Sequence, residues 1–142
     1  MSGQKQTETQ MARKKQVDAG LVDPKVSIRV LLAVLWVGHF MLWTFGDMFS
    51  LTQEMGEPVT DSMILIIAPT TAIVQALTAV YCLVGRPTHV RWANLILAPV
   101  YLLANVVFFV DATQAWEYYL GVFYVLFNVL IFWFAYRWPT SE

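Results

Sequence analysis

The sequence contains little charge and a single cysteine. Only 13% of its 142 residues are charged, whereas 58% are hydrophobic. A water-soluble domain of this size could not bury so much apolar surface, so the composition excludes an ordinary soluble fold. One cysteine, Cys82, allows no internal disulfide and no electron relay between paired thiols. Cys82 is therefore expected to be a small packing residue in a membrane protein.

Several kinds of functional site are also missing from the sequence. It has no Gly-rich phosphate loop, and its two histidines, His39 and His89, are not the paired ligands that hold a haem between helices. The acidic segment from Glu54 to Asp61 does not have the spacing of a calcium loop. We therefore expect no cofactor, no metal, no catalytic residue and no nucleic-acid partner.

Four long apolar segments dominate what is present. Each has roughly the 20 residues that cross about 30 Å of hydrocarbon, and the connections between them are short. We therefore expect an all-α membrane protein with four transmembrane helices in an up-down-up-down antiparallel bundle. The predicted helices span about 24–50, 62–84, 90–110 and 116–136, within a transmembrane domain of residues 23–138. Residues 1–22 are predicted to form a mobile polar tail, and residues 139–142 a short second tail.

Local signals mark the ends of the predicted helices. Asp23 and Pro24 suit the start of the first helix, because Asp can accept bonds from free amides and Pro fits the first turn. The segment from Gly85 to Pro87 is typical of a helix end, since Gly closes a helix and Pro cannot continue it.

The basic residues predict the orientation of the chain. All nine flank the same side of the predicted spans: Lys5, Arg13, Lys14, Lys15, Lys25, Arg29, Arg86, Arg91 and Arg137. Basic residues beside membrane spans are retained on the cytoplasmic side. The sequence therefore predicts a multi-pass membrane protein with the N-terminus and C-terminus both cytoplasmic.

Polar and aromatic residues recur along one face of each predicted helix. At 100° per residue, Trp36, His39, Trp43 and Asp47 share a face of the first helix. Ionisable groups at membrane depth are unfavourable unless paired or hydrated, so this face should point into the bundle. The candidate polar cavity or ligand site consists of His39, Trp43, Asp47, Gln75, Asn94, Tyr101, Asn105, Tyr124 and Asn128.

We call these polar faces the polar seam, and two explanations of it remain open. In the first, the seams meet at the bundle axis and form interhelical hydrogen bonds, each worth on the order of 1 kcal/mol. In the second, they surround a hydrated cavity or a polar small-molecule site, with His39 and Asp47 as its titrating groups. On the fourth helix the seam is expected to begin at Glu117.

Small residues form a second stripe on the second predicted helix. Small side chains permit close helix approach in membranes. This stripe is expected to seat a neighbouring helix or a second copy of the protein, and it comprises Ala68, Ala72, Ala76 and Ala79.

The segment from Trp43 to Leu51, Trp-Thr-Phe-Gly-Asp-Met-Phe-Ser-Leu, resembles small bacterial four-span membrane proteins classed only as a domain of unknown function. The likeness includes Ala68-Pro69 of the second helix and extends over roughly residues 28–137. It implies the same four-helix topology and a location in the bacterial inner membrane. It implies no activity, substrate or catalytic residue.

Two functions follow from this reading. The first is a non-enzymatic membrane module that self-associates or joins a larger membrane complex. The second is a minimal transporter or a small-molecule or lipid-binding bundle; small multidrug transporters share this size and span number but use a glutamate in their first helix. An intramembrane enzyme is less favoured, because eight residues separate His39 from Asp47, about 12 Å along one helix.

Overall fold

The computed structural model describes residues 26–52, 66–110 and 112–139. These residues form four helices, α2 (Ile28–Thr52), α3 (Ala68–Val84), α4 (Pro87–Val110) and α5 (Ala115–Tyr136), and they include no β-strand. The prediction of an all-α fold is confirmed. The predicted tail at 1–22, the last three residues of the predicted tail at 139–142, and the acidic segment from Glu54 to Asp61 lie outside the described residues.

The starts of α2 and α4 differ from the predicted ones, and the predicted start of the second helix at about 62 lies outside the described residues. The first helix, α2, begins at Ile28 rather than near Pro24, and the Ser27 hydroxyl oxygen accepts a hydrogen bond of 3.3 Å from the Val30 amide. The third predicted helix, α4, begins at Pro87 rather than Val90, with the Val90 amide donating to the Arg86 carbonyl at 2.9 Å. Proline suits a first helical position because the amide it lacks would have no partner there. Pro87 is therefore the start of α4 as well as the barrier that ends α3.

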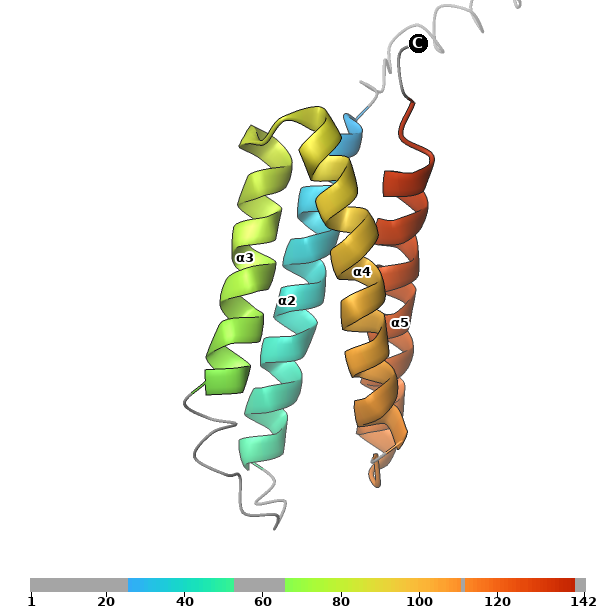
Figure 1. The fold of residues 1–142 in the computed structure, drawn as a ribbon. Helices are drawn as coiled ribbons and strands as arrows, with labels where there is room; N and C mark the ends of the chain where they lie inside the picture. The colour runs from blue at the N-terminus through green and yellow to red at the C-terminus, as the bar shows by residue number, and fades with distance from the viewer. Residues whose placement is uncertain (1–25, 53–65, 111, 140–142) are drawn as a thin grey trace, which may run out of the picture.

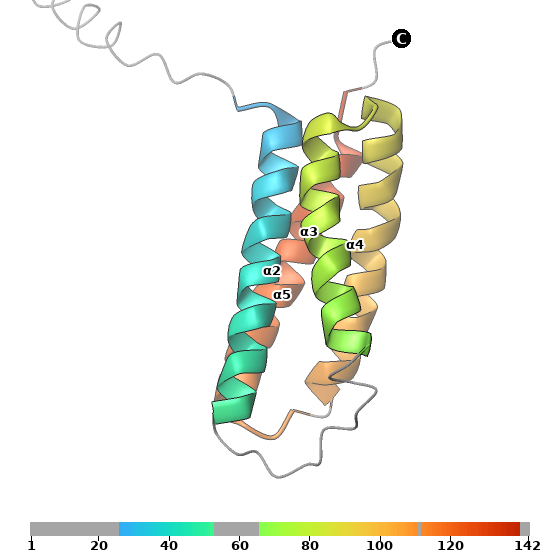
Figure 2. The ribbon, with the colours of Figure 1, turned by 90° about the vertical axis from the view of Figure 1, so that its left-hand side faces the viewer.

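The helices lie side by side in one bundle (Figure 1, Figure 2). The first helix, α2, packs against both α3 and α5, and α4 packs against α5. Although one short turn joins α3 to α4, their backbones have little direct contact. Side chains bridge them instead, and the Tyr101 hydroxyl donates to the Thr71 carbonyl at 2.9 Å. The start of α2 and the end of α5 lie at the same end of the bundle (Figure 1).

Two arginines tie helix ends together at that end of the bundle. Arg29 of α2 donates to the carbonyl of Gly85, just beyond α3. Arg91 of α4 donates to the carbonyls of Ala135 and Tyr136, at 3.2 and 3.3 Å, in the last turn of α5. The last carbonyls of a helix have no partner within it, and positive charge near them is favourable. These arginines therefore stabilise helix ends in addition to their predicted role in orientation.

Glu117 stabilises the start of α5 and does not join the polar seam. Its Oε2 atom accepts hydrogen bonds from the amides of Thr113 and Gln114, at 2.7 and 2.8 Å, in a reciprocal capping arrangement. Those amides precede the helix and would otherwise have no partner. The prediction that the seam begins at Glu117 is wrong, because the side chain turns back toward the loop.

The distribution of side chains is that of a membrane protein. Three helices, α2, α4 and α5, are long and apolar enough to cross a bilayer, whereas α3 has 17 residues. Several amides are buried inside, and large apolar side chains are exposed along every helix, among them Val34, Leu77, Leu103 and Val122. An exposed apolar surface of this extent suits contact with lipid rather than water.

Candidate functional site

A buried histidine lies at the centre of the polar interior. His39 of α2 is 0% exposed, and its Nδ1 atom lies 2.7 Å from Oε1 of Gln75 on α3. Its Nε2 atom lies 2.9 Å from Nδ2 of Asn128 on α5 and 3.3 Å from Nδ2 of Asn105 on α4. One imidazole therefore bonds to an amide from each of the other three helices.

The amides determine where the imidazole proton lies. Asn128 also donates through Nδ2 to the Tyr124 carbonyl at 2.8 Å, and Asn105 accepts through Oδ1 from the Trp43 indole at 3.1 Å. These second bonds fix both amides with their NH₂ groups toward His39, so Nε2 must accept. Nδ1 then carries the proton and donates to Gln75. The arrangement fits a neutral imidazole, because an N–H at Nε2 would face two donors.

A second buried group lies one turn of α2 earlier. The Trp36 indole donates to Oδ1 of Asn94 at 2.6 Å, and Asn94 Nδ2 donates to the Val90 carbonyl at 2.8 Å. The same Nδ2 lies 3.4 Å from the sulfur of Cys82, which is buried on α3. Cys82 is thus a packing residue beside an amide, and the group joins α2, α3 and α4.

Aromatic rings enclose His39. The centroids of Trp36, Trp43, Tyr101 and Tyr124 lie 5.9, 6.2, 5.7 and 5.9 Å from the imidazole centroid. These rings separate the hydrogen-bonded groups from the surrounding lipid-facing surface. Buried hydrogen bonds are stronger in such a low-dielectric environment than in water.

Gly46 permits one of these rings to bond to the backbone of α2. The Tyr124 hydroxyl donates to the Leu42 carbonyl at 3.0 Å, and a Cβ atom added at Gly46 would lie 2.6 Å from that hydroxyl oxygen. A larger residue at position 46 would have to displace Tyr124. The glycine in the Trp43–Leu51 segment therefore provides the space that Tyr124 occupies.

The structure brings eight of the nine predicted seam residues together. His39, Gln75, Asn94, Tyr101, Asn105 and Asn128 are buried, and Trp43 and Tyr124 are half-buried beside them. Asp47 does not join them, because it lies two turns beyond His39 and its side chain is exposed. Trp36 belongs to the site but was not among its candidates, although its position three residues before His39 on the same face could have identified it.

The predicted alanine stripe is divided between inside and outside. Ala79 is buried, Ala68 and Ala72 are half-buried, and Ala76 is exposed. One edge of the stripe therefore faces the bundle and the other faces outward.

The hydrogen bonds of His39 within the described residues all join it to neutral amides. Neither nitrogen of His39 bonds to a carboxylate, the group that orients a catalytic histidine in acid–base sites. Within residues 26–52, 66–110 and 112–139, no three His, Cys, Asp or Glu side chains gather to hold a metal ion.

No protein-family model, curated protein or solved structure matches this chain. The resemblance to small bacterial four-span proteins therefore stays a prediction from the residues that carry it.

Proposed function

We propose that the protein is a non-enzymatic membrane module that acts by binding other membrane helices, in a second copy or in a larger complex. The observation that carries this proposal is the bonding of both His39 nitrogens to amides from the other three helices. Both nitrogens of the buried imidazole are engaged by side chains of the bundle itself, so the proposal assigns partner contacts to the outer surface.

The exposed edge of the alanine stripe supports the same proposal. Ala76 faces outward on α3, the helix that has close backbone contact with α2 but little with α4. A small side chain on a lipid-facing surface lets a second helix approach closely.

Enlarging Ala76 should therefore weaken association. For Ala76→Leu we expect the apparent affinity between two copies to fall about fivefold, equivalent to about 1 kcal/mol. The affinity is measured in liposomes by energy transfer between donor-labelled and acceptor-labelled copies. Val122→Leu is the matched control, because Val122 is an exposed apolar residue of α5, which lacks the close backbone contact with α3 that α2 has, and its change should leave the transfer unaltered. A chain that is monomeric in liposomes and crosslinks to no protein in its native membrane would contradict the proposal.

We further propose that α3 forms the fourth span and that both termini are cytoplasmic in a bacterial inner membrane. The arginines at residues 29, 86, 91 and 137 support this orientation. With Cys82 buried, a cysteine placed at position 56 should react with an impermeant maleimide from outside the cell. A cysteine replacing Thr88, which is exposed in the first turn of α4, should react only from inside. The reverse labelling pattern would refute this topology.

One observation favours the second candidate, a small-molecule-binding or transport bundle. Two buried atoms of the His39 network, Nε2 of Gln75 and Oδ1 of Asn128, make no hydrogen bond of ordinary geometry with any described residue. The Gln75 atom is a donor and the Asn128 atom an acceptor, and together they could bind water or a small polar solute beside the imidazole. The substitution at His39 argued below separates this candidate from the module.

A further inference from the structure

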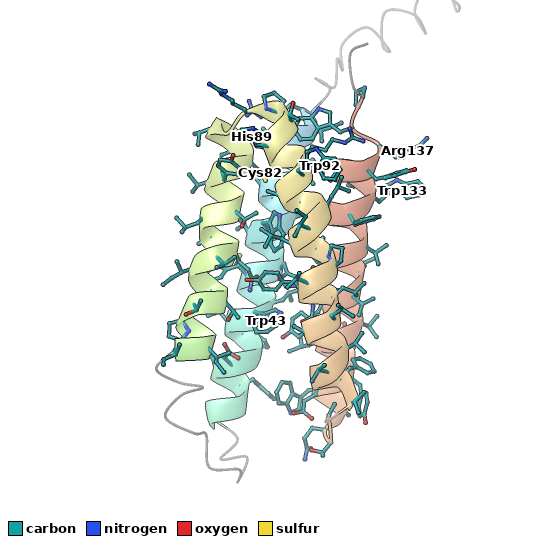
Figure 3. The ribbon with its side chains drawn as sticks, viewed as in Figure 1. Trp43, Cys82, His89, Trp92, Trp133 and Arg137 are labelled. Atoms are coloured by element: carbon teal, nitrogen blue, oxygen red, sulfur yellow. The ribbon has the colours of Figure 1, made fainter. Side chains whose placement is uncertain are left out.

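The last turn of α5 brings two arginines and a tryptophan together. Arg91 reaches across from α4 to the carbonyls of Ala135 and Tyr136. Arg137 follows directly, with its guanidinium carbon 5.1 Å from the centroid of the Trp133 ring. Figure 3 shows Arg137 and Trp133 at this end of α5, on the side away from α3. Two guanidinium groups thus lie at one helix end, and one of them is held against an indole.

These positive charges have no counter-charge in the part of the chain that the structure describes. The basic residues there are Arg29, Arg86, Arg91 and Arg137, all at the same end of the bundle. The acidic residues there are Asp47, late in α2, and Glu117, at the start of α5, and both belong to the opposite end. An anionic partner from outside the described residues would balance this end electrostatically.

The surroundings of the two arginines match the boundary of a membrane. Trp92 on α4 and Trp133 on α5 are 59% and 51% exposed, and both lie near this end of the bundle (Figure 3). Exposed indoles are enriched at the level of lipid headgroups. Exposed apolar residues continue along α5 from this point, including Phe132 and Val129. A ligand with an anionic head and apolar chains could contact all of these groups at once.

We propose that Arg137 and Arg91, with Trp133, bind the phosphate of an anionic phospholipid whose chains lie along the exposed surface of α5. Guanidinium groups bind phosphate through paired hydrogen bonds, and only two of the five N–H groups of Arg91 are used by the α5 carbonyls. A lipid fits better than a soluble phosphate because the apolar surface begins within one turn of the arginines. The site does not depend on self-association.

Competition between lipids in a nanodisc tests the site. The full chain is reconstituted in equal parts of phosphatidylglycerol and phosphatidylcholine, and retained lipids are counted by native mass spectrometry. The wild type should retain phosphatidylglycerol preferentially. Arg137→Gln should lower the ratio of the two retained lipids about fivefold, since it removes one of the two guanidinium groups and its charge-assisted hydrogen bonds to the phosphate. Arg137→Lys should fall between them, because it keeps the charge but loses the planar guanidinium.

Arg86→Gln is the matched control. Arg86 is exposed at the same end of the bundle, in the turn before α4, and its change should alter the ratio less than about twofold, because a solvated charge outside the site is screened by salt. Equal losses of the lipid ratio in Arg86→Gln and Arg137→Gln would mean that the whole basic end of the bundle attracts the lipid without a specific site, and would overturn the proposal. No preference for phosphatidylglycerol in the wild type would also overturn it. Displacement of the lipid by inorganic phosphate would assign the arginines to a soluble anion instead and would also overturn the proposal.

Discussion

Replacing His39 with leucine is expected to lower the free energy of unfolding by about 3 kcal/mol, from the loss of three interhelical bonds in a buried network. The bonds run from one imidazole to Gln75, Asn105 and Asn128, and so connect α2 to each other helix. Leucine has a similar bulk but leaves the amides facing an apolar group. The measurement is reversible unfolding in mixed micelles, followed by circular dichroism.

A lipid-facing change in the same helix controls for this experiment. Val37→Leu alters an exposed residue of α2 and should shift stability by less than about 0.5 kcal/mol. In a double-mutant cycle with Asn128→Leu, the combined loss should be smaller than the sum of the single losses, because both changes remove the same bond. If His39→Leu instead folds as stably as the wild type and loses uptake, efflux or solute-induced thermal stabilisation, the small-molecule-binding bundle is the correct function.

The faces of the helices could be predicted from the sequence, but the bonds between them could not. Helical periodicity alone places Asn94 and Asn105 on one face of α4, since 11 residues make about three turns. Which of them meets His39 depends on the axial offset between α2 and α4, which is set by packing. In the structure Asn105 bonds to His39, whereas Asn94 bonds to Trp36. A single sequence contains no signal for that offset.

Asp47 shows where periodicity is insufficient. It shares the face of His39 by angle, but the last turns of α2 lie near the end of the bundle, where a side chain on that face can remain exposed. Glu117 differs for another reason, because the free amides before α5 compete for its carboxylate. In both cases depth along the helix, rather than angle around it, determines the partner. The residues near the middle of the helices are those that periodicity placed correctly.

Replacing Trp36 with alanine is expected to lower the free energy of unfolding by about 3–5 kcal/mol, the usual range for removing a buried aromatic side chain. Trp36 is 0% exposed and packs edge-on against Tyr101, with ring centroids 5.3 Å apart. Alanine would leave a cavity at the junction of α2 and α4 and would leave Oδ1 of Asn94 without its indole donor. Lipid outside the bundle provides no hydrophobic drive to close that cavity, so the lost packing contacts are not replaced.

Two further variants separate packing from hydrogen bonding. Trp36→Phe keeps much of the ring volume and removes the donor to Asn94, so it should cost about 1 kcal/mol. Trp92→Ala removes the same side chain from an exposed position on α4 and should cost less than about 1 kcal/mol. Comparable losses for Trp36→Ala and Trp92→Ala would mean that the two indoles are equally buried in the folded protein, as when α4 faces a partner rather than lipid. We expect the loss of stability to be largest for Trp36→Ala, smaller for Trp36→Phe and smallest for Trp92→Ala. This order requires that the packing of the buried indole contributes more to the contact between α2 and α4 than its one hydrogen bond does.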